Sequence, residues 1–270
     1  MSKKTKSPVW IVILVVAAIL VVIAGTLIVK EKISGNVYPV VSFEIENYGT
    51  IKAELYPQYA PNTVSNIVAL VESGYYNNKV IYGKDLICLY LGRDSEGNVI
   101  NPTAGLIEEG ISLGSNSDIE YTIPGEFVEN GFKMNTLRHE KGVLSLIRND
   151  YTQAVPALIE ESYNSGNAQI GIMMGDTSSN LNGVYAAFGK ITEGLDILEK
   201  IYTKTELADP EVDEEGNVVP AAISKFKVFP VIKSATVETN GVDFGVPVYQ
   251  EAFDYDSYMY DLINAQYGSN

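Results

Sequence analysis

The feature that most limits how this chain can fold is an uncharged run near its start. VWIVILVVAAILVVIAGTLIV occupies residues 9–29. At about 1.5 Å rise per residue, a helix of this length crosses a hydrocarbon core of roughly 30 Å. The run is longer than the apolar part of a signal peptide, about 7–15 residues, and it lacks a small-residue exit. An uncleaved transmembrane anchor is therefore favoured over a cleaved signal.

Lysines set the predicted orientation of this anchor. Lys3, Lys4 and Lys6 precede the run, whereas Lys30 and Lys32 follow it beside acidic residues. Because cytoplasmic flanks carry the excess of Lys and Arg, we expect a single-pass membrane protein with its N-terminus in the cytoplasm. The predicted division is a cytoplasmic leader at 1–8, an anchor at 9–29, a linker at 30–37 and an extracytoplasmic domain.

Charge and cysteine content exclude several classes of function. The chain has 19 Lys and Arg against 34 Asp and Glu, a formal net charge of -15. This charge repels nucleic acid, which is not an expected partner. Cys88 is the single cysteine, so an intrachain disulfide and a thiolate metal cluster are both excluded. The acidic segment at 208–220 lacks spaced calcium ligands and is interpreted as a solvated turn, so no metal is assigned.

Residue periodicity predicts a domain rich in β-structure. Apolar Val41, Phe43 and Ile45 alternate with polar residues in the segment 40–56, which predicts a hairpin. After Pro61, apolar residues recur at helical spacing until Gly74, which predicts a helix. Short buried strands are expected at 142–146, 168–174 and 184–191, and a second helix at 195–201. The count favours one small barrel or sandwich with two helices.

Six ordered segments carry a resemblance to a known family. The hairpin is followed by APNTVSNIVALVESGYYNN, YTIPGEF, HEKGVLSLIR, SGNAQIGI and LNGVYAAFGKITEGLDILEKI. Residues 38–238 thereby resemble a cyclophilin-type peptidyl-prolyl isomerase domain. The resemblance implies a mainly β fold, a closed antiparallel eight-stranded barrel capped by two helices. It also implies that no cofactor is needed and that the partners are proline-containing or unfolded exported polypeptides.

The chemistry of the family depends on one arginine. Amide resonance gives prolyl bond rotation a barrier of roughly 18–20 kcal/mol, and catalysis must stabilise the twisted state selectively. In the family, an apolar pocket holds the proline ring and an arginine donates to the prolyl nitrogen. Here the usual Phe-His-Arg falls on Ile81, Tyr82 and Gly83. The resemblance therefore predicts a site without its donor and with a gap at Gly83.

Other groove positions also differ from the family pattern. By the resemblance the substrate groove consists of Ile81, Gly83, Cys88, Leu89, Leu91, Ile147, Ile170, Gly171, Leu181 and Tyr185. Leu91 takes the place of a glutamine, and Gly171 of an aromatic residue, which should open the floor of the proline pocket. The alternative is that the apolar members simply fill a core, as period-two apolar residues usually do.

Two polar residues are candidates for chemistry. Arg148 follows the strand LSLI at a position that lines the family groove, and it is the one catalytic candidate; the alternative is an ordinary exposed or ion-paired arginine. His139 is the single histidine, and we interpret it as a structural loop residue that bonds nearby backbone.

Three functions remain open from the sequence. The first is a membrane-anchored prolyl isomerase with a degenerate site and weak turnover, and the second a non-catalytic module that binds proline-containing segments. The third is a structural domain that docks on a membrane complex. Residues 239–270 form an acidic, tyrosine-rich tail without sustained periodicity, which either packs on the domain or forms an adhesive strip for a partner.

Overall fold

The predicted hairpin begins the part of the chain that the structure describes. In the computed structural model, which describes residues 38–107, 118–215 and 217–267, β1 (Val40–Ile45) pairs antiparallel with β2 (Gly49–Leu55). Phe43 lies opposite Ile51, and both side chains are buried. The alternation in the sequence therefore places one apolar face of the hairpin in the core, as predicted.

The first predicted helix is also confirmed. The helix α2 (Pro61–Glu72) has proline at its first turn, where a missing N–H costs no helical hydrogen bond. Its apolar stripe is buried, and Gly74 follows with φ of +76°, a left-handed conformation that suits glycine.

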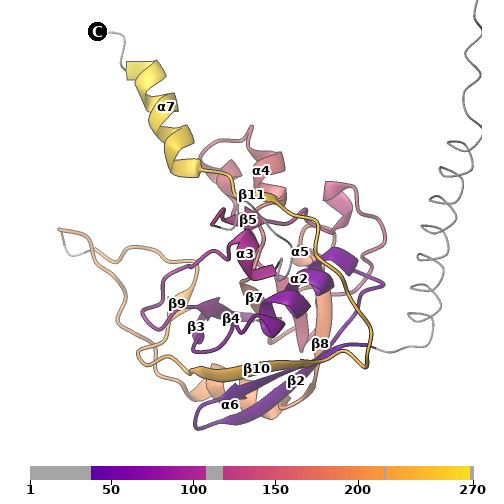
Figure 1. Ribbon diagram of the computed structural model, residues 1–270. Helices are drawn as coiled ribbons and strands as arrows, with labels where there is room; N and C mark the ends of the chain where they lie inside the picture. The colour runs from indigo at the N-terminus through magenta and orange to yellow at the C-terminus, as the bar shows by residue number, and fades with distance from the viewer. Residues whose placement is uncertain (1–37, 108–117, 216, 268–270) are drawn as a thin grey trace, which may run out of the picture.

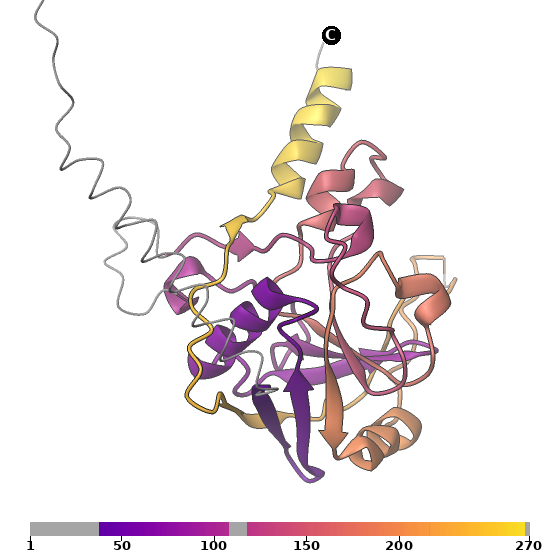
Figure 2. The same ribbon diagram turned by 90° about the vertical axis from the view of Figure 1, so that its right-hand side faces the viewer.

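Nine strands form one antiparallel sheet that curls around the core (Figures 1 and 2). The order is β10-β1-β2-β8-β6-β7-β4-β3-β9. The remaining strands of this sheet are β3 (Val80–Lys84), β4 (Cys88–Arg93), β6 (Val143–Leu146), β7 (Ile170–Met173), β8 (Ala187–Glu193), β9 (Ser224–Lys225) and β10 (Ile232–Glu238). The main core lies between the sheet, α2 and α6 (Leu195–Lys204).

The sheet is not the closed eight-stranded barrel that the resemblance implied. Its end strands are β10 and β9, and an isolated bridge joins Val80 of β3 to Val231, which precedes β10. Ile232 also exchanges backbone hydrogen bonds with Asn78 and Lys79, just before β3. The Ile81 amide donates to the Pro230 carbonyl at 2.9 Å, but Pro230 has no N–H to return the bond. The ladder therefore stops there, and β9 pairs with the free edge of β3.

Short helices supplement the two that the sequence predicted. Besides α2 and α6, the described residues contain α3 (Ala104–Ile107), α4 (Ile159–Tyr163), α5 (Ser178–Leu181) and the 3-10 helices η1 (Val128–Asn130) and η2 (Tyr151–Gln153). Each lies in a connection between strands, so the mainly β assignment stands.

The C-terminal tail is more ordered than its composition suggested. Its strand β11 (Gln250–Glu251) pairs with β5 (Tyr121–Thr122) in a separate two-stranded sheet. The helix α7 (Tyr255–Tyr267) follows and projects away from the sheet (Figure 1). The sequence pattern of the tail, which lacks sustained periodicity, therefore did not predict this strand and helix.

The predicted anchor lies outside the described residues, together with the predicted leader at 1–8 and the linker at 30–37. Among the residues that are described, no helix has the length and apolar character needed to cross a membrane.

Candidate functional site

The predicted groove residues divide between the two faces of the sheet. Ile81, Leu89, Leu91 and Ile170 are buried in the main core, inside the curl of the sheet. Because side chains alternate across a strand, their neighbours Tyr82, Cys88, Tyr90 and Gly171 belong to the outer face. For the four interior residues, the structure therefore agrees with the interpretation that they fill a core.

The outer face carries a second, smaller apolar cluster. It contains Cys88, Val143, Met173 and Ala187, and Leu181 packs against it. Burial raises the pKa of the Cys88 thiol well above its usual range, so the unreactive thiol form dominates. Cys88 is therefore a buried filler of this cluster, in agreement with the alternative that the apolar groove members fill a core.

The floor at Gly171 is filled. A Cβ atom built on Gly171 would lie 2.8 Å from Ile147 Cδ1 and 2.9 Å from Cys88 Sγ. Two predicted groove residues therefore occupy the space of the aromatic side chain that the family carries. The expectation that glycine opens this pocket is wrong, because neighbouring side chains have moved into the volume.

The space at Gly83 is closed as well. A Cβ atom there would lie 2.5 Å from the Ser224 carbonyl oxygen and 2.9 Å from Ile223 Cγ2, because β9 runs along this part of β3. Contacts shorter than 3.0 Å are essentially never seen for real Cβ atoms. The predicted gap is therefore absent, and no side chain of any kind fits at Gly83 without movement of β9.

Arg148 is held by carbonyl oxygens and aromatic rings. Its Nε donates to the Val184 carbonyl at 3.2 Å, and a terminal nitrogen donates to the Asn149 carbonyl at 3.3 Å. The guanidinium carbon lies 4.6 Å from the centre of the Tyr185 ring and 5.0 Å from that of Tyr163. Arg148 is half-buried, so neither sequence interpretation, a free donor or an ordinary surface arginine, describes it fully.

Three further residues meet on the outer face beside β3. The Tyr82 hydroxyl bonds the Gln169 side-chain oxygen at 3.3 Å, and the Arg93 guanidinium carbon lies 3.9 Å from the centre of the Tyr82 ring. Burial raises the pKa of Tyr82 to about 12, so its hydroxyl remains a donor at neutral pH. Arg93 also donates to the Gly97 carbonyl at 3.1 Å. Sequence reasoning named Tyr82 only as a replaced position and missed the cluster.

Comparison with known proteins decides the family. The sequence model described as "Cyclophilin type peptidyl-prolyl cis-trans isomerase/CLD" matches residues 40–227. This chain belongs to that family. The resemblance read from the ordered segments is thereby confirmed, and the low identities below fit a divergent member.

Relatives of this cyclophilin include isomerases from fungi and bacteria. Peptidyl-prolyl cis-trans isomerase-like 4 of Neurospora crassa is 28% identical over 63% of this chain and 31% of its own length. A probable peptidyl-prolyl cis-trans isomerase of Brucella suis is 25% identical over 65% of this chain and 78% of its own. Peptidyl-prolyl cis-trans isomerase B of Bacillus subtilis is 26% identical over 59% of this chain and 87% of its own length. The chain thus spans about a third of the Neurospora protein's length.

A solved structure is also similar to this chain. The cyclophilin type peptidyl-prolyl cis-trans isomerase of Cryptosporidium parvum, crystallised in the presence of the dipeptide Ala-Pro, is 21% identical over 71% of this chain and 98% of its own. The TM-score is 0.42.

His139 is a buried structural residue in this cyclophilin. Its Nδ1 donates to the Asn182 side-chain oxygen at 3.0 Å, which leaves Nε2 to accept from the Ser145 hydroxyl, also at 3.0 Å. Burial lowers the pKa of His139, so the ring is neutral near pH 7. The partners are side chains in place of the nearby backbone that we expected.

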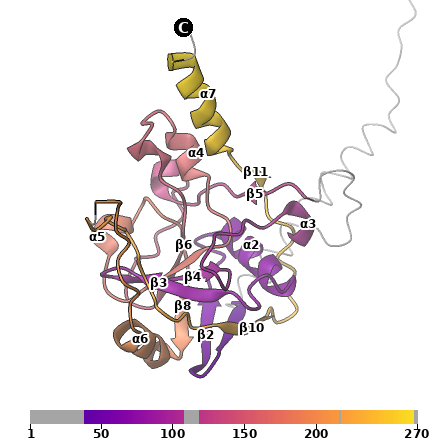
Figure 3. The same cartoon turned by 90° about the vertical axis from the view of Figure 1, so that its left-hand side faces the viewer.

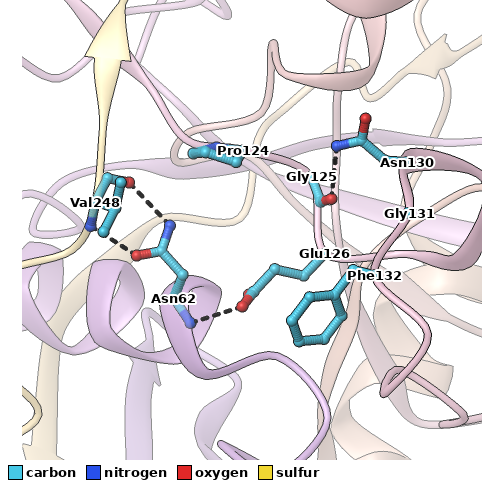
Figure 4. A pocket seen from close by; sticks show the side chains of 8 residues that line it. All are labelled: Asn62, Pro124, Gly125, Glu126, Asn130, Gly131, Phe132 and Val248. Atoms are coloured by element: carbon cyan, nitrogen blue, oxygen red, sulfur yellow. Dashed lines mark hydrogen bonds between the residues drawn. The ribbon is translucent and has the colours of Figure 1, made fainter.

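The cyclophilin domain also has an open cavity beside the motif YTIPGEF, which sequence analysis did not assign to a site. Figure 4 shows the Glu126 side chain reaching the backbone nitrogen of Asn62, while the Asn62 side chain turns toward Val248; the cavity that these residues line measures about 400 Å³. The Glu126 carboxylate accepts from the backbone N–H of Asn62 at 2.9 Å and of Thr63 at 2.7 Å. It therefore satisfies free donors in the first turn of α2. Burial nevertheless raises the pKa of this carboxyl.

Proposed function

We propose that this cyclophilin binds proline-containing segments of exported polypeptides and isomerises them only slowly. The observation that carries the proposal is the closed space at Gly83, where the family's donor falls by the resemblance. Without a donor to the prolyl nitrogen, the twisted state gains no more stabilisation than the planar states, and the barrier stays high. Binding without fast turnover is the consequence.

Features around the Arg148 rim support peptide binding. Ile147, Leu181 and Tyr185 are half-buried. Leu181 packs against the outer apolar cluster, Ile147 fills the space over Gly171, and the Tyr185 ring lies under the Arg148 guanidinium. An apolar surface with an arginine at its margin suits a proline ring next to peptide carbonyls, since guanidinium groups donate in a planar fork. This observation favours the second candidate function, a non-catalytic binding module, if turnover is absent.

The location of the clients rests on the uncharged run at 9–29. We propose that it anchors the chain with the domain outside the cytoplasm, so the clients are polypeptides that have been exported. The net charge of -15 disfavours nucleic acid as a client.

The direct test is exchange NMR on a proline tetrapeptide. The full chain is placed in nanodiscs of zwitterionic lipid, and the Bacillus subtilis relative serves as the reference isomerase. We expect exchange to be slower than with the reference by about 10²–10³-fold, the usual cost of losing one preorganised donor. Equal rates would refute the degenerate site.

Peptide titration in the same samples separates the three functions. Binding-induced shifts of the peptide resonances, together with a small acceleration of prolyl cis/trans exchange, support a weak isomerase. Binding with no acceleration at all identifies a binding module. If the peptide neither binds nor exchanges, a structural docking domain is the remaining candidate.

A further inference from the structure

With respect to the residues that the structure describes, α7 is half-buried at Tyr255, Tyr258 and Met259 and exposed from Tyr260 to Gln266. It stands off the domain in all three views (Figures 1, 2 and 3), and Tyr260, Leu262 and Ile263 are 68%, 42% and 51% exposed. It lies outside residues 40–227, which match the cyclophilin family. A function for α7 is therefore a property of this chain in addition to the proposed isomerase site.

One face of α7 is apolar. Tyr258, Met259, Leu262 and Ile263 follow one another at helical spacing, and we call these four residues the α7 stripe. Such spacing is typical of helices that lay an apolar face into the groove of a partner. Tyr260 points away from the stripe and provides an internal control.

Acidic residues border the stripe on both sides. Asp256 lies one turn before Met259 on one side of the stripe, and Asp261 lies one turn after Tyr258 on the other, whereas α7 contains no Lys or Arg. A second copy of this chain would bring like charges together at both margins and would carry the same net charge of -15. Lys or Arg along the margins of the partner would instead complement the stripe.

The base of α7 is fixed so that the stripe has a defined direction. The rings of Tyr255 and Tyr151 stack with centroids 4.8 Å apart, which ties α7 to η2. Asp254 caps the helix through the Ser257 N–H at 2.9 Å. Because one end of α7 is already held, docking of a partner helix would cost α7 little conformational entropy.

We propose that α7 is a docking helix for another protein, which presents an amphipathic helix with an apolar seam and basic margins. The apolar stripe supplies contact area, and the acidic margins select a cationic partner over a second copy. This docking does not depend on turnover at the isomerase site.

The test uses designed helical peptides and the full chain in zwitterionic nanodiscs. The basic probe is a fluorescein-labelled heptad peptide with Leu at positions a and d and Lys at e and g. One matched peptide carries Glu in place of Lys, and another has the basic composition in scrambled order. Anisotropy titrations, with empty nanodiscs as the blank, should show binding of the basic probe only, weakening as salt is added.

Variants of α7 keep the proposal falsifiable. Combined Met259→Ala, Leu262→Ala and Ile263→Ala preserves a strong helix former at each position and should weaken binding by about tenfold or more. Asp256→Asn with Asp261→Asn should weaken it by about threefold. Tyr260→Ala is the matched control and should leave the affinity unchanged.

Three outcomes would overturn the proposal. One is equal binding of the scrambled peptide, because charge alone would then suffice. Another is unchanged affinity in the triple alanine variant. The third is self-association of the parent, measured by sedimentation, that disappears in the triple variant, since the occupant would then be a second copy.

Discussion

The surroundings of Arg148 determine what its substitution can change. Its guanidinium bonds two backbone carbonyls and lies over aromatic rings, so Arg148→Lys loses both the planar fork and ring contacts. We expect unfolding free energy to fall by about 0.5–1 kcal/mol. Peptide affinity should fall slightly, and the low turnover should not change. Denaturant titration and exchange NMR measure these quantities.

The control for this substitution is Arg138→Lys. Arg138 is exposed and forms a surface ion pair with Glu140 at 3.3 Å, so its replacement should change neither stability nor affinity. A selective collapse of turnover in Arg148→Lys would show that Arg148 is the catalytic donor, against our expectation.

Protonation of His139 contributes to the pH dependence of stability. Its pKa is lowered in the folded state by burial, so the unfolded chain binds this proton more readily. The stabilisation is fully present above the unfolded pKa of about 6.5 and is lost as pH falls through the folded pKa. Denaturant titrations at pH 7.5 and pH 5 should show a smaller pH-dependent loss in His139→Gln than in the parent. Equal losses in both proteins would contradict the assignment.

At the scale of elements, the packing of β9 against β3 predicts that adding a single methyl group at Gly83 lowers the stability of the protein. Gly83→Ala puts a methyl group against the Ser224 carbonyl, so β9 must move. We expect a loss of about 1–3 kcal/mol of unfolding free energy, as for other overpacked sites. The matched control is Gly175→Ala, because nothing lies within 4 Å of its Cβ position. If both variants unfold at the same denaturant concentration, β9 does not cover Gly83.

Elements with a repeating pattern were predictable, and those without one were not. The alternation in β1 and β2 and the helical spacing in α2 are local signals that tertiary structure preserved. In contrast, β9 and β11 contain two residues each, too few for a period to show. The closure at Gly83 comes from residues distant in sequence, so the local sequence suggested a gap where none exists.

At the scale of the whole molecule, the lysine distribution predicts topology. With the anchor at 9–29 and a cytoplasmic N-terminus, external protease on intact cells should digest the domain and spare the first residues. Mass spectrometry of the retained peptides identifies the protected part. Complete protection, with digestion only after lysis, would reverse the predicted orientation.

The groove shows which features of the whole molecule a family resemblance can predict and which it cannot. It correctly predicted the family and the mainly β architecture. It did not predict that Ile147 and Cys88 fill the space at Gly171, because this filling arises only from their three-dimensional packing.

The attachment of the tail has a mechanical consequence. Between the sheet and α7, the chain is held by the β11–β5 pair, by the hydrogen bonds of Asn62 with Val248 and by that of Ser65 with Gly245. A pulling force on α7 would load the ring contacts of Tyr151 first and then these bonds. Because the bonds are few and can break one after another, the tail would detach before the nine-stranded sheet unfolds and would then act as an extensible tether with the folded domain at its end.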